Sequence, residues 1–142
     1  MKNTNGIPNG YQLVFDARYQ IDCKLLEIQT WFFSNCPKGP AVIGISGGKD
    51  SMIMANLMRH LQRISDTKFE LVYLCMDPGY KEVNRKKIED NARLMNIELD
   101  IFKSDIFDAV NTMDGSPCYM CARMRRGHLY AKAKELGCNK IA

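Results

Sequence analysis

The sequence predicts an α/β protein: a doubly wound, mostly parallel sheet in a three-layer α/β/α arrangement. Short, continuously apolar runs at residues 41–45, 71–76 and 99–102 are typical of strands that are covered on both faces. These runs alternate with longer segments in which apolar residues recur every three or four positions, as on one face of a helix. In such sheets, ligands bind beyond the carboxyl ends of the strands, so the turns after the strands are the candidate site.

The first half of the chain is expected to form a helix, a strand and a second helix. Residues 11–34 carry an apolar face spaced for a helix: Ile21, Leu25, Ile28 and Phe32. Proline and glycine within residues 37–40 end this helix. The strand at 41–45 leads through a Gly-rich turn at 46–51 into a helix whose expected apolar face is Ile53, Leu57, Leu61 and Ile64.

The second half repeats the alternation. The strand at 71–76 ends in a turn at 77–79, and a helix marked by Ile88, Ala92 and Met95 follows. A weaker strand at 99–102 precedes an irregular connection with a turn at Asp114-Gly115. A last helix spans about Pro117 to Leu136 and ends at Gly137, after which Asn139 opens a fourth strand.

Composition narrows the class of protein. The 142 residues are 46% hydrophobic and 25% charged, which argues against a disordered chain or a coiled coil. The longest apolar run, at 71–76, is too short to cross a membrane, and residues 1–10 lack the apolar core of a secretory signal. The expected location is therefore the cytoplasm. Six cysteines without an export signal indicate thiols, metal ligands or redox groups.

The Gly-rich turn Ser46-Gly47-Gly48-Lys49-Asp50-Ser51 has the features of an anion site. Glycines let an anion approach the backbone, and the amides and partial positive charge of a helix N-terminus point at it. The alternative is a tight turn capped by Asp50 or Ser51. The P-loop of common nucleotide hydrolases does not match, because Gly44 and Gly48 enclose only three residues.

This turn resembles the SGGKDS signature of the PP-loop ATP pyrophosphatases, whose fold is Rossmann-like (adenine nucleotide alpha hydrolase-like). The resemblance implies that ATP is split between its α and β phosphates to adenylate a substrate oxygen. Residues 46–51 would hold pyrophosphate and Mg²⁺, with Lys49 and Asp50 catalytic, and Met76 and Asp77 would lie by adenosine. Preorganised amides, a lysine and a metal suit the charge that develops on pyrophosphate.

A second motif, Cys118-Tyr-Met-Cys121, lies at the predicted start of the last helix, with Ser116 as N-cap and Pro117 at the first helical position. Cysteines three apart share a helix face, and the helix N-terminus stabilises their thiolates. The two cysteines could bind a metal or carry sulfur, or they could be two small residues with no shared function. A structural zinc needs four ligands, and Cys138 lies roughly 25 Å further along the helix.

Residues 118–142 resemble the corresponding stretch of the tRNA 2-thiocytidine synthetases. In that family the CxxC pair and a third cysteine hold a [4Fe–4S] cluster whose open iron would bind the sulfide to be transferred. Cys118 and Cys121 match, whereas the third cysteine and a later Gly-His segment have no counterpart here. We therefore expect residues 1–38 to be an N-terminal extension and 39–142 a PP-loop domain cut in its fourth strand, inactive alone.

Basic residues gather on the last helix and account for the whole net charge of +4. The only acid between Cys118 and Leu136 is Glu135, against five cations: Arg123, Arg125, Arg126, Lys132 and Lys134. They fit a solvated helix face, or a track for an RNA backbone that binds by phosphate neutralisation. Tyr119, Tyr130 and His128 are candidates for stacking on a base, and we assign His128 no catalytic role.

Together these motifs predict an ATP-dependent tRNA thiolase. It would adenylate the C2 oxygen of a cytidine in the anticodon region and replace that oxygen with sulfur through an iron–sulfur cluster. The predicted partners are tRNA and an unidentified sulfur donor, and the oligomeric state stays open, a homodimer included. The alternatives are another PP-loop adenylating enzyme, amidating or sulfonucleotide-processing, and a noncatalytic metal-binding or RNA-binding module.

Overall fold

A computed structural model describes residues 16–35, 39–105 and 117–142, with the side chains of 117–120 outside that description. Within it, four strands form one parallel sheet in the order β3-β2-β1-β4. The strands are β1 (Ala41–Gly44), β2 (Leu71–Asp77), β3 (Leu99–Lys103) and β4 (Lys140–Ile141). The predicted fold class is confirmed, and β4 begins one residue later than expected.

The register brings the carboxyl ends of the strands to one edge of the sheet. Ala41 of β1 lies opposite Leu71 of β2 and Lys140 of β4, and Tyr73 of β2 lies opposite Leu99 of β3. After β1 the chain adds β2 and β3 on one side, and then returns to place β4 on the other side. This reversal of strand order beside β1 is the topological switch point, where sheets of this kind bind ligands.

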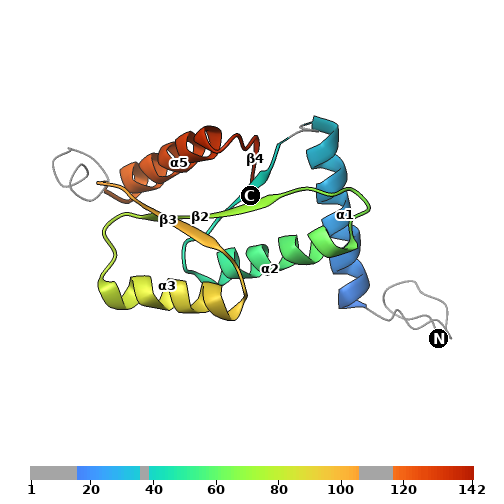
Figure 1. The fold of residues 1–142 in the computed structure, drawn as a ribbon, viewed down its shortest axis with the longest axis horizontal. Helices are drawn as coiled ribbons and strands as arrows, with labels where there is room; N and C mark the ends of the chain where they lie inside the picture. The colour runs from blue at the N-terminus through green and yellow to red at the C-terminus, as the bar shows by residue number, and fades with distance from the viewer. Residues whose placement is uncertain (1–15, 36–38, 106–116) are drawn as a thin grey trace, which may run out of the picture.

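Helices cover both faces of the sheet (Figure 1). α2 (Lys49–Ile64) and α3 (Glu82–Leu94) lie on one face, and α5 (Pro117–Glu135) lies on the other. Alternate strand residues supply the two cores: Ile43 and Cys75 pack toward α2 and α3, whereas Val42 and Leu74 pack with residues of α5. Because both faces are buried, the strands are apolar throughout, as the sequence pattern predicts.

The first helix, α1 (Ala17–Asn35), packs on α2. Leu25 and Phe32 are buried and Ile28 joins the same core, as predicted. Ile21 is wrong as a core residue because 42% of it is exposed. Helical spacing alone assigned Ile21 to the packed face.

The buried face of α2 agrees with the predicted one at Leu61, which is buried, and at Leu57, which packs on the core, and differs from it at Ile53 and Ile64. Its buried residues are Ala55, Met58 and Leu61, whereas Ile53 is 55% exposed and Ile64 is at the surface. A helix packed closely on a sheet favours small and adaptable side chains at the contact, so Ala55 and Met58 replace the more hydrophobic isoleucines. In α3 the prediction holds, since Ile88 and Ala92 are buried and Met95 packs beside them.

The end of α5 follows the expected chemistry. Gly137 has a φ of +73°, a left-handed conformation that favours glycine after a helix. The predicted N-cap Ser116 and the turn at Asp114-Gly115 lie outside the described residues. Among the helices that are described, none is both long and apolar enough to cross a membrane.

Candidate functional site

The Gly-rich turn joins β1 to α2 at the carboxyl edge of the sheet. α2 begins at Lys49 with Gly48 as its N-cap, and Gly48 makes no side-chain cap hydrogen bond. The first helical hydrogen bond runs from the Met52 amide to the Gly48 carbonyl, so the amides that precede Met52 face out of the helix N-terminus. The N-cap is therefore Gly48 and not Asp50 or Ser51, and a helix N-terminus of this kind is able to bind an anion.

The hydroxyls of Ser46 and Ser51 form hydrogen bonds within the turn. The Ser51 hydroxyl accepts a hydrogen bond from the Ser46 amide at 3.1 Å and donates one to the Gly48 carbonyl at 3.0 Å. The Ser46 hydroxyl lies 3.1 Å from that of Ser51 and accepts from the Gly48 amide at 3.3 Å. These contacts fix the turn before any ligand arrives, which is the preorganisation that an anion site needs.

Glycine is required at position 47 for two reasons, its backbone conformation and the lack of space for a side chain. Its φ is +83°, and a Cβ placed there would lie 2.7 Å from Cγ1 of Ile88, a buried residue of α3. Any side chain would be strained and would also push α3 away. The tight contact therefore seats the turn directly on the core.

Lys49 and Asp50 extend from the turn into solvent. Their side chains form an ion pair with each other and are 82% and 85% exposed. An exposed pair of this kind contributes little to stability, so both groups are available to a ligand. Lys49 can place its charge near an anion at the helix end, and the Asp50 carboxylate is a ligand type that suits Mg²⁺.

Asp77 ends β2 with its side chain buried. One carboxylate oxygen accepts hydrogen bonds from the amides of Gly79 (2.9 Å) and Tyr80 (2.7 Å), and the other faces Arg85 at 3.5 Å. Burial alone would raise the pKa of Asp77, but these amides and the charges of Arg85 and Lys103 outweigh it and hold the pKa below its ordinary value. Asp77 thus shapes the wall of the site by fixing the turn after β2.

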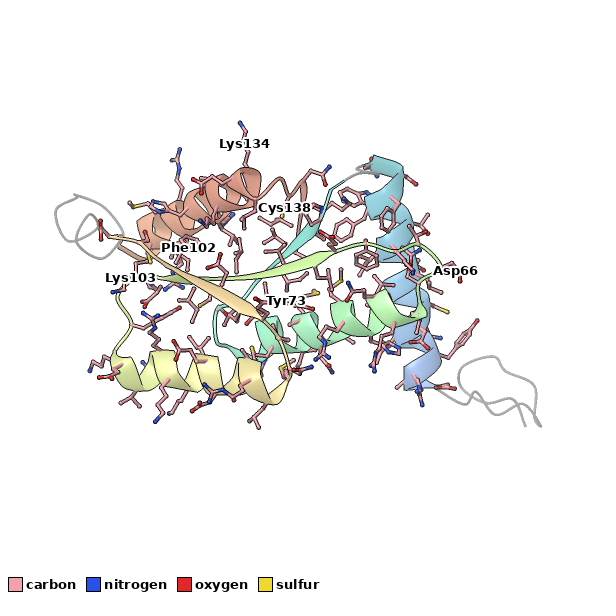
Figure 2. All side chains as sticks on the ribbon, viewed as in Figure 1. Asp66, Tyr73, Phe102, Lys103, Lys134 and Cys138 are labelled. Carbon is pink, nitrogen blue, oxygen red and sulfur yellow. The ribbon has the colours of Figure 1, made fainter. Side chains whose placement is uncertain are left out.

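The start of α5 lies against the end of β2. Cys121 is partly buried and packs with Met76, together with Phe102 of β3 and Met124 of α5. Figure 2 shows Phe102 and Lys103 at the end of β3, beside the start of α5. Cys118 is helical, one turn before Cys121, and its side chain lies outside the described residues.

The other described cysteines do not join this pair. Cys75 is a core residue, as predicted, and burial raises the pKa of its thiol to about 11. Cys138 is buried beyond the far end of α5, and burial raises the pKa of its thiol too. Within the described ranges, no group of three or more histidine, cysteine or acidic side chains is placed to hold a metal.

A pocket of about 250 Å³ opens at the topological switch point. Its walls come from the ends of β1 and β2, from Ser46 and Tyr80, and from Arg125, Arg126 and Leu129 of α5. Gly44 borders it closely, since a Cβ there would lie 3.0 Å from Leu129. A larger hollow of about 730 Å³ lies between α3 and β3 and contains no residue of the Gly-rich turn in its lining.

The predicted RNA-binding arginines do not share one environment. Arg125 and Arg126 both line the pocket, but Arg125 is partly buried and Arg126 is exposed, and Arg123 is exposed outside the pocket lining. The sequence reasoning did not find Tyr80, whose hydroxyl donates to the Ser46 carbonyl at 3.5 Å, although an aromatic residue directly after a predicted turn was a usable signal. It also missed the contact between Ser104 and His128, whose Oγ and Nδ1 lie 3.0 Å apart.

A parallel Rossmann-like sheet with this Gly-rich turn at its switch point defines a PP-loop α/β enzyme fold, and solved structures share it. NH3-dependent NAD synthetase from Campylobacter jejuni matches with a TM-score of 0.64 and 20% identity, covering 88% of this chain and 55% of that one. The U34-tRNA thiolase NcsA from Methanococcus maripaludis, solved with its [4Fe-4S] cluster, matches with a TM-score of 0.67 and 19% identity, covering 99% and 52%.

The chain is more specifically a homologue of proteins named tRNA-cytidine(32) 2-sulfurtransferase. It is 35% identical over 103 residues to the protein from Citrifermentans bemidjiense and 36% identical over 107 residues to that from Pseudomonas fluorescens strain Pf0-1. These matches cover 70% and 71% of this chain but only 40% and 38% of the relatives, so the chain spans well under half of their length. No protein-family model matches it. The homology confirms the resemblance to the tRNA 2-thiocytidine synthetases.

Proposed function

We propose that this chain carries the ATP-binding part of an ATP-dependent tRNA thiolase. The observation that supports this best is the position of the CxxC helix: Cys121 packs on Met76 at the end of β2, while the Gly-rich turn leaves the neighbouring strand β1. The Gly-rich turn and Cys121 thus lie at the same edge of the sheet, and Cys118 is one helical turn before Cys121. The names of its homologues, tRNA-cytidine(32) 2-sulfurtransferases, point to the same reaction.

In the proposed reaction, the C2 oxygen of a cytidine in the anticodon region attacks the α-phosphorus of ATP and pyrophosphate leaves. Sulfide then replaces the adenylated oxygen at C2, and AMP departs with that oxygen. The amides and hydroxyls of residues 46–51, with Lys49, would hold the pyrophosphate, and Asp50 would bind Mg²⁺. Met76 and the turn fixed by Asp77 would form the wall beside adenosine.

The cysteines at the start of α5 are suitable ligands for an iron–sulfur cluster, although they are fewer than a whole cluster needs. Cys121 is a free thiol with apolar side chains around it, and Cys118 lies one helical turn away, so both belong to one face. Cys118 and Cys121 would be two of the thiolate ligands of a [4Fe–4S] cluster. When bound, such a cluster would hold the sulfide that is transferred, which a separate sulfur donor would provide. The exposed Arg123 and Arg126 would meet the tRNA backbone.

The finer assignments belong to the same proposal. Residues 39–142 would be the ATP-binding domain and residues 1–38 an N-terminal extension. The enzyme would work in the cytoplasm with Mg²⁺, tRNA and a sulfur donor, and a homodimer is one assembly to test. The alternative function is that of another PP-loop adenylating enzyme, which would use ammonia as the nucleophile or process a sulfonucleotide.

The most informative test is mass spectrometry of tRNA nucleosides from a strain that lacks the gene, with and without complementation by the full-length protein. We expect loss of one thiolated cytidine, restored by the wild type and not by Lys49→Ala, Cys118→Ala or Cys121→Ala. Cys138→Ala is the matched control and should restore it. An unchanged nucleoside profile in the deletion strain would refute tRNA thiolation.

A second measurement separates the two parts of the site. After anaerobic reconstitution with iron and sulfide, the wild type should show a broad absorbance band near 400 nm. Cys118→Ala and Cys121→Ala should lose this band, whereas Lys49→Ala should keep it and lose ATP-dependent pyrophosphate release. Stoichiometric zinc without bound iron would contradict the cluster assignment.

A further inference from the structure

Arg125 differs from the other cations of α5 in its surroundings. It is partly buried and lines the pocket at the carboxyl ends of β1 and β2, whereas Arg123 is exposed to solvent. The Nε atom of Arg125 is buried and makes no hydrogen bond within the described part of the chain. A charged group in this position is costly unless an anion or acceptor meets it.

Neighbouring carboxylates do not neutralise Arg125. At the same edge Arg85 forms ion pairs with Glu89 at 3.0 Å and with Asp77 at 3.5 Å. Among the described residues, Arg125 forms no ion pair with any carboxylate. The pocket therefore presents a partly buried guanidinium whose charge no carboxylate matches, beside the exposed Arg126. The ligand that suits the Arg125 guanidinium is a phosphate, which accepts two parallel N–H donors.

Tyr80 connects this guanidinium to the Gly-rich turn. The Tyr80 hydroxyl donates to the Ser46 carbonyl at 3.5 Å, and both residues line the same pocket as Arg125. Burial raises the pKa of Tyr80, and the charge of Arg125 and a side-chain hydrogen bond from it act in the opposite direction. A neutral phenol held between the turn and α5 limits where the guanidinium can lie.

We propose that Arg125 belongs to the nucleotide site: its guanidinium binds a phosphate group of ATP at the Gly-rich turn, and Tyr80 is the positioning residue that orients it. This inference rests on the proposed ATP site and departs from the assignment of Arg125 to the RNA track. Ser46, Tyr80 and Arg125 would then form one anion subsite made from three segments of the chain, with Lys49 approaching from the solvent side.

The test compares binding of two phosphate ligands with binding of tRNA, using the full chain. Calorimetry with ATP and with inorganic pyrophosphate should show at least tenfold weaker binding for Arg125→Gln. Arg125→Lys, which keeps the charge but not the paired donors, should lie between it and the wild type, and Tyr80→Phe should lose about two- to fivefold. Lys134→Gln removes one charge from the far end of the same helix and should bind both ligands as the wild type does.

The tRNA arm distinguishes the two sources of phosphate. Arg125→Gln should leave the salt dependence of tRNA binding unchanged, whereas Arg123→Gln should lower its log–log slope by about 0.7–0.9. If Arg125→Gln lowers that slope and leaves ATP and pyrophosphate binding intact, the residue belongs to the RNA track and the inference falls. Should Arg125→Gln fail to fold, Arg125→Lys and Tyr80→Phe carry the test, with wild-type affinities in both counting against it.

Lys49→Ala separates this inference from the proposed function. If Lys49→Ala weakens ATP binding while the Arg125 variants do not, the ATP site stands and only the role of Arg125 is overturned. If the wild type binds neither ATP nor pyrophosphate, the proposed function and the inference fail together.

Discussion

The turn at Gly47 allows a quantitative prediction for Gly47→Ala. A left-handed backbone costs an alanine about 1–2 kcal/mol relative to glycine. The added Cβ would also lie 2.7 and 2.8 Å from two atoms of the buried Ile88, and relieving such overpacking costs about 1–3 kcal/mol more. The variant should therefore lose about 2–5 kcal/mol of unfolding free energy, or about 6–15 °C in Tm.

Urea unfolding and calorimetry measure this loss directly. Gly48→Ala is the matched control, because Gly48 has a φ of −77° and a Cβ there would lie 3.5 Å from the Ser46 hydroxyl, an ordinary contact. A double-mutant cycle with Ile88→Ala isolates the steric part: Gly47→Ala should be less destabilising in the Ile88→Ala background. Equal losses for Gly47→Ala and Gly48→Ala would refute the reasoning.

Three further outcomes follow from the same structure. Asp77→Asn keeps the shape but loses the charge, so it should cost about 1–2 kcal/mol at pH 7. Because the folded pKa of Asp77 is lowered, that difference should shrink as the pH falls below about 4 in urea titrations, and a constant difference would contradict it. Iodoacetamide should label Cys121 in the native protein and spare Cys75, whose thiol is buried, as peptide mass spectrometry can show. Gly127→Ala should raise stability by about 0.5–1 kcal/mol, since Gly127 lies within α5 and a Cβ there meets nothing within 4 Å; a lower Tm would show a hidden contact.

The strand pattern was predictable because a strand covered on both faces has to be apolar at every position. The runs at 41–45 and 71–76 have no other simple interpretation when a turn signal follows each. The buried face of α2 was predictable only in part: Leu57 and Leu61 pack in the core as expected, but hydrophobicity alone could not show which small side chains contact the sheet. Ala55 lies at the contact while Ile53 is exposed.

A candidate site can be predicted from sequence where a continuous motif encodes it, as for residues 46–51 and for Cys118 and Cys121, whose roles stay predictions. Contacts between distant segments carry no such signal. Tyr80 reaches Ser46 across 34 positions, and Arg125 lies one residue from the exposed Arg126, so charge counting could not separate their roles. Both arginines line the pocket, and only the rotation of α5 against the sheet decides which of them is partly buried.

The two walls of the pocket are held by different forces. The wall that contains Ser46 follows directly after β1, and β1 is hydrogen-bonded to β2 on one side and to β4 on the other. α5 is attached to the sheet through side chains: Ala133 and Met124 by packing, and His128 by its contact with Ser104. Backbone ladders resist sliding, whereas packed side chains permit small shear movements. A ligand in the pocket would therefore contact one wall that is fixed by strand pairing and one wall whose position depends on the side-chain packing of α5, the helix that carries Cys121 and Arg125.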